Sequence, residues 1–134
     1  MDRKESRKLS REWIGILLLA VLLVSGFAVS ILMHRHAGTL AGILEDAARA
    51  ALAEDWETAA EGYASACRDW QKGWKLLAVV ADHTALEEID DLFIQLGVHS
   101  TARERGEFTV ACAQLVGQIR QLGQHQQLTW WNLL

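Results

Sequence analysis

The chain has 134 residues, 51% of which are hydrophobic, and its formal net charge is −4 at pH 7. This length accommodates one small domain. The negative charge argues against nucleic acid as a partner, because a phosphate backbone attracts basic surfaces.

The first predicted element is the apolar segment over residues 13–33. Its 21 residues include no charged side chain. As a helix the segment would extend about 32 Å, which is enough to cross a bilayer core of roughly 30 Å. A helix inside a globular domain is normally shorter and polar on one face. We therefore predict a transmembrane helix over residues 13–33.

The charges that flank this segment predict its orientation. Residues 1–12 form a basic tail with five Lys and Arg side chains against three acidic ones, whereas only Arg35 lies close on the other side. The positive-inside rule then predicts a single-pass protein of the cell membrane, with a cytoplasmic tail and an extracytoplasmic helical domain over residues 37–134. A cleaved signal peptide is the main alternative, since Ala28–Ser30 has suitably small residues, but the apolar run continues past them.

Helical periodicity dominates the rest of the chain, beginning at residues 40–52. Apolar side chains recur there on one helix face, namely Leu40, Ile43, Leu44, Ala47, Ala48, Ala51 and Leu52. Only Gly38 and Gly42 separate this face from the apolar segment, so the two are compatible with one continuous helix. Asp55, in a turn at Glu54–Trp56, is the predicted N-cap of the next helix.

The second helix carries most of the aromatic side chains. Alternating steps of four and three residues connect Trp56, Ala60, Tyr63, Cys67, Trp70, Trp74, Leu77 and Ala81. Charged side chains fall elsewhere on this helix. We therefore predict that the aromatic residues form a seam packed against other helices rather than a ligand site. The alternative is a seam that opens to hold a small apolar ligand or a lipid.

Two capping boxes predict where the third and fourth helices begin. They are Thr84 with Glu87 and Thr101 with Glu104. The buried faces that follow are Leu86, Ile89, Leu92, Phe93 and Leu96 in the third helix, and Phe108, Ala111, Cys112, Leu115, Val116, Ile119 and Leu122 in the fourth. Gly97 and Gly123 are the predicted ends of these helices.

The predicted fold class is all-α, with an N-terminal transmembrane helix followed by a small antiparallel bundle of about four helices. Trp130 and Trp131 in the tail either pack onto this bundle or anchor at a membrane surface. Cys67 and Cys112 both lie on inward faces. A disulfide between them and two buried free thiols are equally compatible with the sequence.

The sequence offers little catalytic chemistry. Asp82 and His83 resemble an acid–base pair, but no nucleophile in a strained turn accompanies them, and residues between helices commonly cap backbone groups. We therefore expect a structural role for the pair and predict no enzyme, no metal site and no cofactor. The four carboxylates of EEIDD, residues 87–91, are expected to form a solvated acidic face, with a docking surface for a basic partner as the more specific alternative.

Several short motifs carry a family likeness. They are the basic N-terminus, the single apolar helix, EDWETA, the W-x3-W of Trp70 and Trp74, the DH of Asp82–His83 with the following EEID, and the NLL of residues 132–134. With them the chain resembles the DUF4363 family of small membrane-anchored proteins without assigned function. The resemblance implies an extracytoplasmic helical domain without known catalytic residues, and a membrane-protein partner such as a protein of the DUF421 type. From the well-formed helices and the lack of an active site we predict an accessory or scaffold protein that binds another membrane protein.

Overall fold

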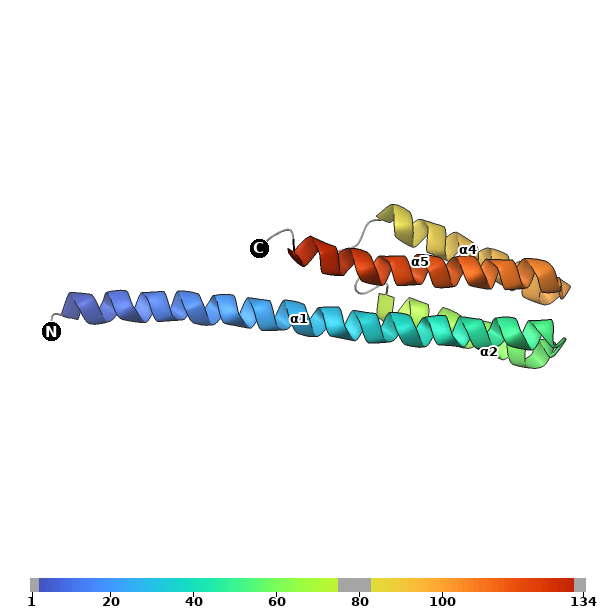
Figure 1. Cartoon of the computed structure of the whole chain (residues 1–134), viewed down its shortest axis with the longest axis horizontal. Coiled ribbons are helices and arrows are strands. Elements are labelled where there is room, and N and C mark those ends of the chain that lie inside the picture. The colour runs from blue at the N-terminus through green and yellow to red at the C-terminus, as the bar shows by residue number, and fades with distance from the viewer. Residues whose placement is uncertain (1–2, 75–82, 132–134) are drawn as a thin grey trace. The chain divides into compact units, whose positions relative to one another are not determined.

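The computed structural model describes residues 3–74 and 83–131, and the side chains of residues 7–73 and 83–124. These residues form α1 (Arg3–Leu52), α2 (Trp56–Asp69), one π-helical turn η1 (Trp70–Trp74), α4 (His83–Ala102) and α5 (Arg105–Trp131) (Figure 1). No strand occurs within the described ranges. The all-α class, with a long apolar N-terminal helix followed by a helical bundle, is confirmed.

Contacts divide the chain into two units, residues 1–33 and residues 34–134. The first unit is the N-terminal part of α1, where the large apolar side chains between Trp13 and Leu32 are 41–70% exposed. Among the described helices, α1 is the one whose length and composition allow it to cross a membrane, although a signal sequence near an N-terminus has the same properties. The apolar helix continues through residues 40–52, as the sequence allowed, since α1 is uninterrupted to Leu52.

The second unit is a bundle of four helical segments, namely residues 34–52 of α1, then α2, α4 and α5. Consecutive segments run antiparallel, so that α2 and α5 point in the same direction (Figure 1). The α1 segment also contacts α5 directly, because the Arg120 guanidinium donates a 2.8 Å hydrogen bond to Glu45. Each helix therefore contributes one face to a shared core.

The core side chains largely agree with the predicted faces. All seven residues predicted for α5, from Phe108 to Leu122, are buried, as are Leu86, Ile89, Phe93 and Leu96 of α4. On α1, Leu40, Leu44, Ala47 and Ala51 are buried. Leu52 was expected on the same face, but it is 53% exposed because α1 ends there.

The turns after α1 and α4 have the same backbone geometry. Glu54 and Arg103 adopt left-handed conformations with φ of 59° and 53°. The N–H group of the next residue then donates a hydrogen bond to a carbonyl five residues earlier. These bonds join Asp55 to Ala50 at 2.9 Å and Glu104 to His99 at 3.0 Å. This is the Schellman pattern, formed here without glycine.

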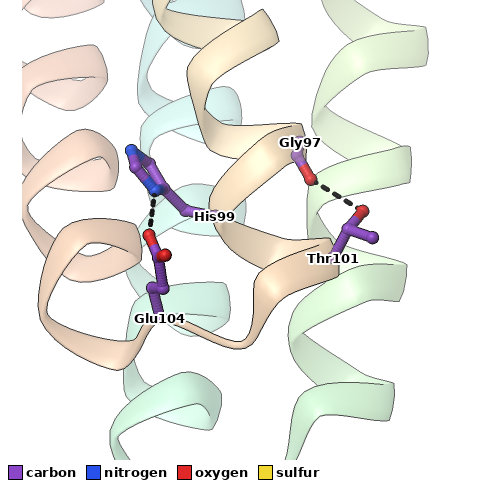
Figure 2. Close-up of polar contacts among 4 residues, drawn as sticks. All are labelled: Gly97, His99, Thr101 and Glu104. Atoms are coloured by element: carbon purple, nitrogen blue, oxygen red, sulfur yellow. Dashed lines mark hydrogen bonds and ion pairs between the residues drawn. The ribbon is translucent and has the colours of Figure 1, made fainter.

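Asp55 caps α2 as predicted. Its carboxylate accepts hydrogen bonds from the Thr58 N–H at 3.3 Å and the Thr58 hydroxyl at 2.6 Å. The hydroxyl first, and then the N–H, hold the pKa of Asp55 below its usual value. At the second turn, His99 Nδ1 lies 2.8 Å from Glu104 Oε2, which ties the end of α4 to the start of α5 (Figure 2).

The predicted ends of the third and fourth helices are wrong. Thr101 does not cap a new helix; it lies inside α4, and its hydroxyl donates to the Gly97 carbonyl at 3.0 Å (Figure 2). α4 continues past Gly97 to Ala102, and α5 continues past Gly123 to Trp131. Gly97 instead permits close packing, since an added Cβ would lie 2.6 Å from the Tyr63 hydroxyl, whereas at Gly123 it would make an ordinary contact of 3.5 Å with Ala37 Cβ.

The packed face of α2 is rotated from the predicted seam. Ala60 is exposed, whereas its neighbour Ala59 is fully buried together with Ala66 and Trp70. Gly62 lies against α1, where a Cβ would meet Ala47 Cβ at 2.8 Å. The close approach of α1 and α2 through small residues explains the rotation, because the bulkier Tyr63 cannot occupy that contact.

We expect Gly62→Ala to lower the free energy of unfolding by about 1–3 kcal/mol, because the new methyl group overpacks the contact with Ala47. Gly117→Ala is the matched control: Gly117 is also helical, but nothing lies within 4 Å of an added Cβ. That control should gain up to about 1 kcal/mol from helix propensity. Chemical denaturation of both variants measures the difference, and equal changes would contradict the proposed α1–α2 packing.

Candidate functional site

A groove runs between α2 and α4 on the surface of the bundle. It consists of two hollows of about 310 and 700 Å³ that share Tyr63 and Ile94. The smaller is lined by Tyr63, Cys67, Trp70, Gln71, Asp90, Phe93 and Ile94, and the larger by Tyr63, Ile94, Gly97, Val98, Thr101 and Ala102. We refer to these residues as the α2–α4 groove.

Trp70 forms the inner wall of the smaller hollow. Its side chain is 2% exposed, and its ring stacks on Phe93 with a centroid separation of 6.0 Å. The indole N–H donates a 2.7 Å hydrogen bond to Asp90 Oδ1, which joins η1 to α4. The inward packing predicted for Trp70 is therefore confirmed. The indole N–H, which is the polar group of this buried side chain, has a hydrogen-bond acceptor in the partly buried Asp90.

Tyr63 and Cys67 lie one helical turn apart on the α2 side. Burial raises the pKa of Tyr63 to about 12, and a hydrogen bond with Cys67 adds to the effect. Burial also raises the pKa of Cys67, although the contact with Tyr63 opposes this shift. Both groups are protonated at neutral pH, so the groove presents a phenol and a thiol rather than an activated nucleophile.

Of the other predicted site residues, the structure describes the side chains of Trp56 and His83. Trp56 is half-buried at the start of α2, and its ring meets Phe108 edge-on at 5.7 Å. His83 is exposed at the first position of α4. Asp82 and the side chains of Trp74, Trp130 and Trp131 lie outside the described residues. The described side chains contain no group of three or more His, Cys, Asp and Glu that would hold a metal ion.

Cys67 and Cys112 are free thiols in the structure. Cys112 is buried and Cys67 is half-buried. The choice between a disulfide and two free thiols stays a prediction.

We expect the bundle to lose stability as the pH rises from about 9 to 12. Burial raises the pKa of Cys112 to about 12, so the folded protein holds this proton more tightly than the unfolded chain does. The associated stability is present below pH 9 and decreases by up to about 1.4 kcal/mol per pH unit above it. Denaturation of the wild type and Cys112→Ala across this range checks the sign: the variant should show the shallower slope, and identical slopes would contradict the assignment.

Sequence reasoning missed the individual roles of Asp90 and His99. Asp90 was grouped with a solvated acidic face, but it accepts the Trp70 hydrogen bond, whereas Glu87, Glu88 and Asp91 are exposed as expected. The signal for Asp90 was its place one residue after Ile89, on the edge of the buried face. His99 had no recognisable signal, because its partner Glu104 was assigned to a capping box.

Comparison with known proteins identifies one family. Residues 27–133 match the model of the Domain of unknown function (DUF4363). No curated protein matches the chain. No solved structure matches it either. Since the family model covers the bundle and the end of the apolar segment, the chain belongs to the DUF4363 family.

Proposed function

We propose that residues 13–33 anchor this protein in the cell membrane and that the helical bundle lies on the extracytoplasmic side as an accessory or scaffold subunit of another membrane protein. One observation carries the proposal: the large apolar side chains between Trp13 and Leu32 are 41–70% exposed. Lipid hydrocarbon would cover this surface. The basic tail over residues 1–12 favours the orientation with a cytoplasmic N-terminus.

The chemistry of the bundle supports binding rather than catalysis. The α2–α4 groove combines exposed apolar side chains, Ile94 at 65% and Val98 at 60%, with protonated Tyr63 and Cys67. Apolar surface with a few polar groups is typical of protein recognition. In this proposal the protein contributes an interaction surface and no catalytic residue.

Chemical crosslinking in native membranes tests the proposal. The full-length protein should form a specific adduct with one integral-membrane protein, recovered in repeated experiments and absent when the bundle is deleted. A protein of the DUF421 type is the first partner to examine. Adducts that contain only copies of this chain would contradict the accessory role.

A second candidate function is the binding of a small apolar ligand or a lipid. The smaller hollow favours it, because about 310 Å³ between Tyr63, Trp70 and Phe93 lies at the lower end of the range of small-molecule pockets. A ligand that binds only the folded state raises the melting temperature by mass action. Thermal melts with and without lipid extracts separate the two functions, since a partner-binding subunit should show no stabilisation.

A further inference from the structure

One row of side chains along α4 combines apolar and acidic surface. Asp90, Ile94 and Val98 follow at four-residue intervals, or about 6 Å per step. Ile94 and Val98 are largely exposed at the larger hollow, beside Tyr63 of α2. Single exposed apolar residues are ordinary, but two neighbours at the edge of one groove make a contiguous apolar surface.

The other end of this row is negatively charged. Glu87 and Asp91 are exposed there, and Asp90 lines the smaller hollow. None of the three forms an ion pair with another described residue. Among the described residues, no Lys or Arg lines either hollow of the groove. Within the part of the chain that the structure describes, the groove therefore presents apolar side chains and, about one helical turn further along α4, carboxylates that form no ion pair.

We propose that the α2–α4 groove binds an amphipathic, basic helix of the partner protein. The partner's apolar side chains contact Ile94 and Val98, and a Lys or Arg one turn away pairs with the exposed carboxylates of Glu87 and Asp91. This inference rests on the proposed function and specifies the partner's chemistry. A groove of this kind is suited to a helix whose apolar residues recur every three or four positions.

Charge complementarity favours a basic helix in the groove over a second copy of the chain and over an anionic membrane surface. A second copy of the chain that docked through the same groove would bring two sets of carboxylates together, and like charges that face each other across an interface oppose binding. An anionic membrane surface would be repelled for the same reason. A basic helix instead gains from each carboxylate it meets.

Photo-crosslinking from single positions of the full-length protein in native membranes tests the inference. A photoreactive amino acid replaces Ile94 in the groove or, as the matched control, Val110, which is 54% exposed on α5. The crosslinked segments are sequenced by mass spectrometry. We expect the Ile94 probe to attach to a segment with helical apolar periodicity and at least one Lys or Arg within about one turn, and the Val110 probe not to reach that segment.

Charge reversal provides the second measurement. Glu87→Lys with Asp91→Lys should lower the yield of the Ile94 adduct by about tenfold. Glu57→Lys with Glu61→Lys is the matched control, because these are also exposed carboxylates four residues apart, but on α2 and outside the groove. This control should leave the yield unchanged. Melting curves establish that all variants remain folded.

Several results would overturn the inference: an Ile94 adduct with a lipid, a second copy of the chain or an acidic segment, or an equal yield after charge reversal at Glu87 and Asp91. A membrane partner captured from Val110 but never from Ile94 would reject the groove while leaving the proposed function intact. The absence of any partner adduct from either position, together with self-adducts alone in chemical crosslinking, would reject both.

Discussion

Phe108→Ala is expected to lower the free energy of unfolding by about 3–5 kcal/mol. Phe108 is fully buried in the first turn of α5 and meets Trp56 of α2 edge-on. Its removal would leave a cavity beside the Trp56 ring, between α2 and α5. Small domains are stabilised by only about 5–15 kcal/mol in total, so this one change would populate the unfolded state at modest denaturant concentrations.

Urea titration of the bundle signal in membrane-mimetic micelles measures this effect. Val110→Ala is the control, since it also removes apolar atoms from the same helix, but at a position that is 54% exposed. Surface substitutions of this kind usually change stability by less than about 0.5 kcal/mol. If Phe108→Ala and Val110→Ala proved equally mild, Phe108 would not be part of a packed core.

The second large effect is expected within residues 13–33. Leu18→Lys combined with Leu22→Lys places two charges on the apolar helix at positions that are 59% and 65% exposed. Each Lys near the centre of a bilayer helix costs about 2.5–3.5 kcal/mol for insertion, so the pair should abolish stable membrane association. Leu18→Ala with Leu22→Ala keeps the segment apolar and should remain in the membrane.

Carbonate extraction of membranes separates the two outcomes. The Lys variant should appear in the soluble fraction or be degraded, whereas the Ala variant should stay in the pellet. Retention of both variants would show that another part of the chain holds the protein at the membrane. Release of both would show that residues 13–33 do not anchor it by hydrophobicity.

The buried face of α5 could be predicted from the sequence because its apolar side chains recur without competition. Between Phe108 and Leu122 only one helix face is continuously apolar, and all seven of its predicted residues are buried. On α2 the periodicity is ambiguous, since alanines occupy both position 59 and position 60. The contact of Gly62 with Ala47 decides between them, and that contact depends on a helix elsewhere in the chain.

Helix ends were less predictable for a related reason. Gly97 has the local appearance of a stop, but the space that Tyr63 requires explains the glycine without ending the helix. α1 and α4 are instead followed by turns in which Glu54 and Arg103 have positive φ, a backbone conformation that is uncommon for residues other than glycine. The π-helical turn η1 and the Trp70–Asp90 hydrogen bond likewise depend on packing between α2 and α4. The groove arises from this packing, so periodicity alone did not reveal it.

The topology of the full-length protein tests the proposed membrane arrangement most directly. Alkaline phosphatase fused after Leu134 should be active, a green fluorescent protein at the same site should stay dark, and the purified chain should retain its basic N-terminal tail. The opposite reporter pattern would place the bundle in the cytoplasm. A mature chain that begins just after Ser30 and is released from the membrane would show that the apolar segment is a signal peptide rather than an anchor.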